Sequence, residues 1–175
     1  MASKGNDSSA STDSELSPVA GTEVLAGADL VSSISVDTGT TAGTGSTDPK
    51  SCLAKHNEYR LKRSLKPLVW DKGLESDAQS WANEKEGVMM HSSGTGQGEN
   101  LYSGEGGCLS AVTLWMAEGP SSLPSYVVTE NNYLQIGHYS QVLWKTTRKL
   151  GCGQAHGLVV CRYHPPGNML GNKIF

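Results

Sequence analysis

Soon after residue 50, similar side chains recur along the chain at the spacing of a helix. Leu53, Asn57 and Leu61 repeat every four residues, and Ser51 stands where the first turn of a helix needs a capping side chain. This pattern predicts a helix from about residue 52 to residue 64.

A second periodic stretch begins after Asp71, a residue type that commonly caps helices. Leu74, Ala78, Trp81 and Ala82 recur on one face of this stretch, which predicts an amphipathic helix with one buried side.

The third periodic stretch extends from about Cys108 to Glu118. Val112, Trp115 and Met116 form its apolar stripe, and a Gly-Pro pair follows it, where a helix would end. The pattern therefore predicts a third helix that packs through this stripe.

The C-terminal part alternates between helix and strand patterns. The segment YLQIGHYSQVLW, residues 133–144, predicts a short fourth helix that merges into a strand. The segments LGCGQA and LVVCRYH are separated by His156 and Gly157, which predicts an antiparallel hairpin. Helices followed by strands in one compact chain indicate an α+β fold, with helices covering a sheet.

Composition divides the chain at residue 50. Residues 1–50 contain 10 Ser, 7 Thr and 6 Gly and no aromatic residue, whereas every Trp, Tyr, Phe, His and Cys lies later. Such a segment cannot bury enough apolar surface to offset the entropy of ordering. We therefore expect a disordered acidic leader over residues 1–50 and one folded domain over residues 51–175.

Charge excludes one class of partner. The leader has a net charge of −5, and residues 51–175 have a net charge of +2 without a Lys/Arg stripe. A nucleic-acid partner is therefore not expected. No segment is apolar enough for a membrane span, so we expect a soluble chain. We also expect this chain to be a monomer.

Four cysteines, all after residue 50, allow three disulfide pairings. Cys152 and Cys161 lie on facing segments of the predicted hairpin, which favours that pair and leaves Cys52 with Cys108. A four-cysteine zinc site is disfavoured because the chain has no C-x-x-C spacing. Disulfides in a small domain indicate an oxidising compartment, so we expect a secreted, extracellular protein.

Two long segments resemble a known family. GHYSQVLWKTT (137–147) and LVVCRYHPPGNM (158–169) look like the two characteristic segments of the CAP superfamily, which comprises cysteine-rich secretory, antigen-five and pathogenesis-related proteins. HNEYR (56–60), His91-Ser92 and GENLY (98–102) support the match. The pattern is most similar to secreted plant and fungal pathogenesis-related members, and it implies an α-β-α sandwich with a central antiparallel sheet.

The resemblance also implies a cleft in which two histidines and two glutamates converge. The matching positions are His91, Glu99, Glu118 and His138. Imidazole nitrogens bind Zn²⁺ well, so the resemblance implies a divalent-cation site for Zn²⁺ or Mg²⁺ that the fold does not require. The separations of these residues match no local metal motif, and without the resemblance a lone His would more often be a hydrogen-bonded core residue.

A serine-hydrolase triad of Ser140, His138 and Glu118 is a further reading of the same residue types. Ser140 lies only two positions from His138, and the chain has no G-x-S-x-G motif. We therefore assign no catalytic residue and expect a binding module rather than an enzyme.

The resemblance finally implies lipid binding. In similar proteins a mobile aromatic loop before the GHYSQ-type segment is associated with sterols, and a groove between helices with fatty acids. The loop here extends from Gly119 to Ile136 and offers an apolar set of contacts, namely Tyr126, Val127, Val128 and Tyr133. It contains no Phe or Trp, which weakens the expectation for a sterol more than for a fatty acid.

These observations predict a secreted pathogenesis-related-like protein that binds small lipids beside a His/Glu cation cleft. Two alternatives stay open at this point. One is an extracellular interaction protein that recognises host or self proteins without a lipid, and the other is a metal-assisted hydrolase.

Overall fold

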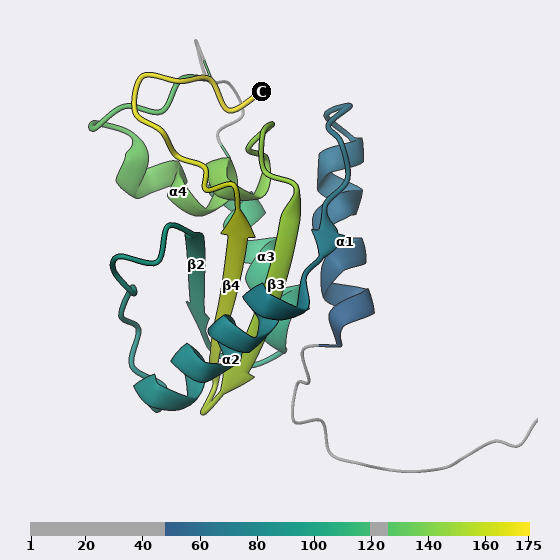
Figure 1. The fold of residues 1–175 in the computed structure, drawn as a ribbon. Coiled ribbons are helices and arrows are strands. Elements are labelled where there is room, and N and C mark those ends of the chain that lie inside the picture. The colour runs from purple at the N-terminus through teal and green to yellow at the C-terminus, as the bar shows by residue number, and fades with distance from the viewer. Residues whose placement is uncertain (1–47, 120–125) are drawn as a thin grey trace, which may run out of the picture. The chain divides into compact units, whose positions relative to one another are not determined.

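The computed structural model describes residues 48–119 and 126–175, and the expected leader lies almost entirely outside them. The described part is an α-β-α sandwich (Figure 1). Its sheet contains four strands in the order β1-β3-β4-β2, where β1 is Val69–Trp70, β2 is Gly98–Ser103, β3 is Lys149–Ala155 and β4 is Leu158–His164. Strands β3, β4 and β2 are antiparallel, and only the two-residue β1 is parallel to its neighbour β3.

Four helices surround this sheet. They are α1 (Pro49–Leu61), α2 (Lys72–Lys85), α3 (Gly107–Ala117) and α4 (Tyr133–Val142). Helix α2 packs on β3 and β4 over one face, and α1 and α3 lie against the other face (Figure 1). The expected fold class and the three expected helices and hairpin are therefore confirmed.

Two local predictions were wrong. Helix α1 begins at Pro49, and Asp48 caps it by accepting hydrogen bonds from the backbone N–H groups of Lys50 and Ser51. A proline at the first helical position shifts the start upstream, so Ser51 lies inside the helix. The fourth helix does not merge into a strand, because turns occupy residues 143–148 before β3 begins.

The two faces of the sheet carry different cores. Alternation along β4 directs Leu158 and Val160 toward α2, and Val159, Cys161 and Tyr163 toward α1 and α3. Helix α2 lies very close to β3, since a Cβ atom at Gly151 would fall on the α2 backbone. Glycine is therefore required there by packing.

Both expected disulfides are present. Cys52 on α1 is bonded to Cys108 at the start of α3, with 5.6 Å between their Cα atoms. Cys152 and Cys161, which face each other across β3 and β4, form the second bond with a Cα separation of 4.1 Å. Hairpin register brings the second pair together, as the sequence predicted.

A buried arginine ties α1 to the chain that follows α4. Arg60 is fully buried, and its guanidinium donates to the backbone carbonyls of Val142 and Trp144 at 2.8 and 3.0 Å. It also donates to the carbonyls of Lys66 and Thr147. Burial, together with the nearby Arg148, lowers the pKa of Arg60 to about 10, so the group is still charged at neutral pH.

We expect Arg60→Met to lower the free energy of unfolding by about 3 kcal/mol or more, because the variant leaves several buried carbonyls without a donor. Lys66→Met is the matched control, since this side chain is exposed, and it should change stability by about 0.5 kcal/mol or less. Urea unfolding followed by fluorescence measures both. Equal stability of the two variants would contradict the role given to Arg60.

Candidate functional site

The first half of the site is a buried glutamate on β2 that holds an imidazole. Glu99 accepts a hydrogen bond from Nδ1 of His91 at 2.7 Å, and the backbone N–H and hydroxyl of Ser92 donate to it at 3.0 and 2.9 Å. The Glu99 side chain is 7% exposed, whereas that of His91 is 59% exposed. The carboxylate thus fixes the orientation of an imidazole that solvent can reach.

A buried cation supports Glu99 from the neighbouring strand. Nη2 of Arg162 on β4 lies 3.2 Å from Oε2 of Glu99. Burial by itself would raise the pKa of Glu99, but the hydrogen bonds from His91 and Ser92 and the charge of Arg162 outweigh it, so the pKa of Glu99 is below its usual value. Glu99 is therefore an acceptor at neutral pH.

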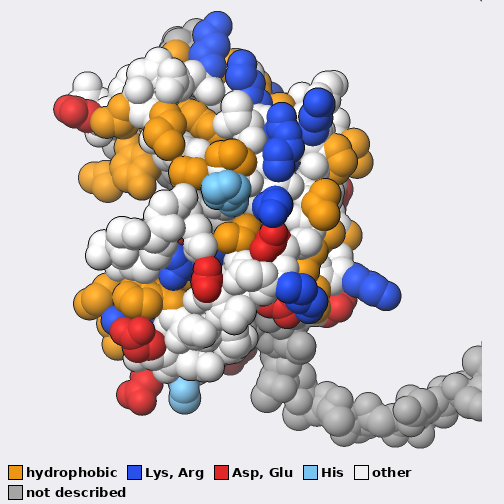
Figure 2. Space-filling model, in the orientation of Figure 1, with side chains coloured by type: hydrophobic (Ala, Val, Ile, Leu, Met, Phe, Trp, Pro, Cys, Tyr) orange, Lys and Arg blue, Asp and Glu red, His pale blue; other side chains and the backbone are white. Residues whose placement is uncertain are grey.

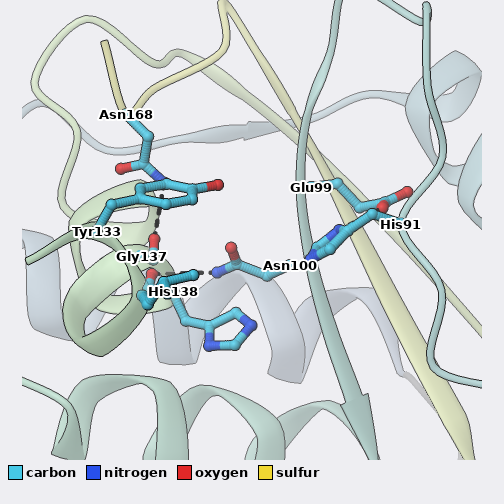
Figure 3. A pocket seen from close by; sticks show the side chains of 8 residues that line it. His91, Glu99, Asn100, Tyr133, Gly137, His138 and Asn168 are labelled. Carbon is cyan, nitrogen blue, oxygen red and sulfur yellow. Dashed lines mark hydrogen bonds and ion pairs between the residues drawn. The ribbon is translucent and has the colours of Figure 1, made fainter. Parts of the chain in front are cut away.

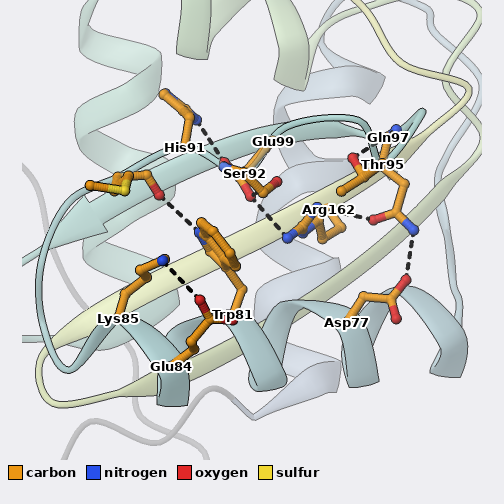
Figure 4. A network of polar contacts seen from close by, with 11 residues as sticks. Asp77, Trp81, Glu84, Lys85, His91, Ser92, Thr95, Gln97, Glu99 and Arg162 are labelled. Atoms are coloured by element: carbon orange, nitrogen blue, oxygen red, sulfur yellow. Dashed lines mark hydrogen bonds and ion pairs between the residues drawn. The ribbon is translucent and has the colours of Figure 1, made fainter.

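This support extends to α2. Arg162 also donates to Oε1 of Gln97 at 3.4 Å, and Gln97 in turn donates to Asp77 on α2 at 2.7 Å (Figure 4). The loop before β2 is therefore connected by polar contacts both to the sheet and to the helix that covers it.

The second half of the site is an equivalent pair on the helices. Oε1 of Glu118, just after α3, lies 2.5 Å from Nδ1 of His138 on α4. The backbone N–H groups of His138 and Tyr139 donate to Oε2 of the same carboxylate. Trp115 stacks on the His138 ring at a centroid distance of 5.8 Å, so this imidazole is held by a hydrogen bond at its edge and an indole at its face.

One cleft receives both imidazoles. Figure 3 shows His91 and His138 on either side of Asn100, with Tyr133 and Asn168 above them. The lining comprises eight residues: His91, Glu99, Asn100, Tyr133, Leu134, Gly137, His138 and Asn168. An adjoining hollow of about 490 Å³ shares His91, Glu99, Tyr133 and Asn168 and extends to Leu170. Glu118 is not part of either lining and lies behind His138.

The four expected residues do not form a compact set of metal ligands. Over residues 48–119 and 126–175, three or more ligand atoms approach within 4.8 Å of one another only at the cysteines. Each histidine uses Nδ1 for its carboxylate, and in the same described ranges neither Nε2 has a hydrogen-bond partner. The free ligand atoms of this cleft are therefore two imidazole Nε2 atoms.

Two asparagines that the sequence did not mark as candidates also contribute to the site. Nδ2 of Asn100 donates to the backbone carbonyl of His138 at 3.1 Å, and Nδ2 of Asn168 donates to the carbonyl of Gly137 at 2.8 Å. Both asparagines lie inside segments that carry the family resemblance, GENLY and PPGNM. Their position in those segments was the available signal.

Asn100 also connects the cleft to a buried histidine on α1. Its Nδ2 donates to the hydroxyl of Tyr163 at 3.3 Å, and that hydroxyl lies 2.9 Å from Nε2 of His56. Nδ1 of His56 must carry the proton, since its partner is the backbone carbonyl of Cys52 at 2.9 Å. Nε2 is therefore the acceptor, and burial lowers the pKa of His56 to about 4.

Ser140 does not form a triad with His138. Its hydroxyl is buried and donates to Asn168 and to the carbonyl of Gly137. The geometry therefore gives this serine a structural position on the buried side of α4 rather than a place beside an imidazole.

The expected lipid-loop residues occupy different environments, and residues 120–125 of that loop lie outside the described ranges. Val128 is fully buried, Val127 forms an antiparallel backbone bridge with Lys173, and the ring of Tyr126 packs at a tilt against that of Phe175, with 4.6 Å between their centroids. Only Tyr133, which is 41% exposed, lines the cleft. The described C-terminal segment therefore packs against the part of the loop that contains Tyr126 and Val127.

Among the helices that the structure describes, none has the length and apolar character needed to cross a lipid bilayer.

Comparisons with known proteins find both similar sequences and similar folds. A family model described as CAP, Cysteine-rich secretory protein family, matches residues 53–163. Pathogenesis-related leaf protein 4 of Solanum lycopersicum is 36% identical over 137 residues, which cover 71% of this chain and 82% of that protein. Venom allergen 5 of Polybia scutellaris rioplatensis is 30% identical over 172 residues, with 78% and 82% covered.

Two solved structures share the fold. The crystal structure of Na-ASP-1 superposes with a TM-score of 0.66 and 30% identity over 77% of this chain, which spans 43% of that longer chain. The crystal structure of NaASP2 with Zn²⁺ has a TM-score of 0.64 and 24% identity, covering 75% of this chain and 87% of that one. Because the identity to NaASP2 is only 24%, this second comparison shows a similar fold and nothing more.

The low pKa of His56 predicts a pH-dependent stability. In the unfolded chain this imidazole takes up a proton below about pH 6.5, whereas the folded protein resists protonation until about pH 4. The unfolded state therefore binds more protons in this window, and His56 should remove about 3 kcal/mol of stability as the pH falls through it. Urea unfolding at several pH values measures the slope.

His56→Gln should be less stable at pH 7 but lose less stability between pH 6.5 and pH 4. His156→Gln, in an exposed turn, is the control and should keep the slope of the unsubstituted protein. A His56→Gln slope equal to that of the control would contradict the assigned tautomer and burial.

Proposed function

We propose that this chain, which belongs to the CAP family of cysteine-rich secretory proteins, is an extracellular module that binds a fatty acid in the His91/His138 cleft. A divalent cation held by the two histidines would assist this binding. The family assignment follows from the match over residues 53–163 and from the pathogenesis-related relatives.

Secretion is supported by the cysteines. All four are paired in two buried disulfides, and no cysteine of the chain is free. Structural disulfides persist in oxidising compartments. Relatives that are 30–36% identical include pathogenesis-related proteins and a venom allergen, so an extracellular location is the consistent proposal.

The proposed class of ligand rests on the contrast between polar and apolar side chains around one cleft. Its floor is polar, with two imidazoles and Asn100, whereas its edge bears exposed apolar side chains. Leu134, in the cleft, is 90% exposed, and Leu170, in the adjoining hollow, is 53% exposed. Figure 2 shows apolar side chains over α4 and, across a hollow, over the loop between α2 and β2.

Exposed apolar side chains beside a polar pocket are typical of a surface that binds an amphipathic molecule. The loop between α2 and β2 contributes Met89 and Met90, which are 54% and 52% exposed and directly precede His91. A carboxylate head group would lie at the imidazoles, and an alkyl chain would cover Tyr133, Leu134 and Leu170. A flat sterol is less suited, because Tyr126 and Val127 are held by the C-terminal segment.

The histidines suit a cation through their hydrogen bonds. A carboxylate on Nδ1 fixes the tautomer of each imidazole and makes Nε2 a better donor of its lone pair to a metal. Two imidazoles favour Zn²⁺ over Mg²⁺, which prefers oxygen ligands. Two protein ligands leave coordination positions for water or for the carboxylate of a lipid, and a bound cation would supply positive charge for that carboxylate.

We expect Zn²⁺ to bind the oxidised protein with one site and to lose that site in the His91→Ala/His138→Ala double variant. Isothermal titration calorimetry measures both. The matched control is His156→Ala/His164→Ala, which removes two exposed histidines outside the cleft. An unchanged isotherm for the cleft variant, or loss of binding in the control, would reject the assignment.

We expect saturable binding of radiolabelled palmitate at equilibrium and weaker binding of cholesterol. Leu134→Asp should weaken palmitate binding about tenfold or more, because a charge replaces an apolar contact of roughly 1.5 kcal/mol or more. Leu114→Asp on α3, where the side chain is 54% exposed, is the matched control and should leave the affinity unchanged. Absence of saturable palmitate binding, or equal affinities for the two variants, would overturn the proposal.

A further inference from the structure

A second group of potential metal ligands lies in the core. The Sγ atoms of Cys52, Cys108, Cys152 and Cys161 are all within 4.8 Å of one another, and all four residues are at most 2% exposed. They come from α1, α3, β3 and β4 respectively. Two helices and the two strands of one hairpin therefore bring four sulfur atoms close together.

The informative separation is the one between the two disulfides. Sγ of Cys52 lies 3.5 Å from Sγ of Cys152, although these sulfurs are not bonded to each other. In a tetrahedral zinc site with Zn–S bonds of about 2.3 Å, neighbouring sulfurs are about 3.8 Å apart. The spacing between the pairs already has this magnitude, so side-chain rotation within the pairs is the main adjustment that a metal would require.

The surroundings favour thiolates when the disulfides are open. Cys108 is in the first turn of α3, an 11-residue helix whose N-terminal N–H groups and dipole favour a negative charge nearby. Nδ1 of His56 lies 4.0 Å from Sγ of Cys52. The N-terminus of a helix thus lies beside one of the sulfurs that would become negatively charged, and the ring of His56 lies beside another.

We propose that the reduced chain binds one Zn²⁺ ion through these four cysteines, at a site separate from the histidine cleft. Reduction by a phosphine or a dithiol adds two electrons and two protons to each disulfide and yields four thiols. Zinc then displaces four protons and forms four Zn–S bonds. Oxidation by a disulfide oxidant reverses the sequence, since each pair of thiolates gives up two electrons to the oxidant and becomes a disulfide, the oxidant is reduced to two thiols, and the zinc is released.

This site gives the reduced chain a means of folding before its disulfides form. Four cysteines allow three pairings, and the structure brings Cys52 as close to Cys152 as a tetrahedral site requires. A zinc ion at the centre would hold all four sulfurs without selecting a pair, and it would replace the two covalent connections between α1, α3 and the hairpin. The inference is independent of the proposed lipid function.

The test uses the full chain carrying His91→Ala and His138→Ala, so that the histidine cleft contributes no metal. The protein is reduced with a phosphine under anaerobic conditions, and Co²⁺ and then Zn²⁺ are added. We expect one equivalent of Co²⁺ to give the visible absorption of tetrahedral cobalt thiolate, Zn²⁺ to displace it, and native mass spectrometry to show one zinc. The oxidised form of the same protein should give no thiolate absorption.

Single Cys→Ser variants at positions 52, 108, 152 and 161 test whether all four sulfurs are ligands. Each should weaken Zn²⁺ binding by at least about tenfold, as expected when one of four thiolates is lost. A variant that keeps the full affinity would remove that cysteine from the site and overturn the four-cysteine assignment.

Folding provides a separate readout in case the reduced chain unfolds without metal. Near-ultraviolet circular dichroism of the reduced protein should recover the native signal on addition of one equivalent of Zn²⁺, and Tm should rise with it. If the reduced protein showed no Zn²⁺ binding and no recovery of the native signal, the proposal would be overturned. Because the cleft histidines are absent from this protein, such a failure would leave the fatty-acid proposal unaffected.

Discussion

The structure depends on a buried positive charge that backbone carbonyls stabilise by accepting its hydrogen bonds. Arg60 lies in the core and donates to four carbonyls, from the turn after α1 and from the segment between α4 and β3. Within the described ranges it has no carboxylate partner. Since an unpaired buried charge is costly, these connections cannot move independently of α1. They fix the end of α4, the helix that carries His138.

Strand β4 connects three parts of the structure, because its side chains point alternately to the two faces of the sheet. Cys161 and Tyr163 point toward α1 and α3, where one belongs to the sulfur cluster and the other is hydrogen-bonded to His56. Arg162, between them, points the other way and pairs with Glu99. Three consecutive residues thus support the disulfide core, the buried histidine and the first half of the cleft, because side chains in a strand alternate between faces.

The cleft itself combines two environments at short range. Each imidazole is oriented by a carboxylate, but one carboxylate is buried beside Arg162 and the other is partly exposed after α3. Apolar side chains lie at the edge of the cleft, with Leu134 in its lining and Leu170 in the adjoining hollow. A polar floor and an apolar edge are the physical basis for an amphipathic ligand, and the sulfur cluster lies apart from them in the core between α1, α3 and the sheet.

The sequence alone determined the elements that depend on local spacing. Periodicity predicted three helices, Asp71 was identified as a cap, and the turn at residues 156 and 157 predicted the hairpin and hence the pair Cys152 and Cys161. The resemblance of two segments to a family supplied the layer order and four candidate residues, of which His91, Glu99 and His138 line the cleft. These features are encoded within short stretches, where one residue limits the conformation of the next.

Only the tertiary structure decided which distant groups meet. His56 and Arg60 occupy helical positions that a pattern of apolar residues does not mark, yet both are fully buried because carbonyls and Tyr163 satisfy their polar atoms. The close approach of four sulfurs depends on the packing of α1 and α3 against the hairpin. Spacing along the chain argued against such a cluster, since C-x-x-C reports only neighbours in sequence, whereas packing joins residues about 100 positions apart.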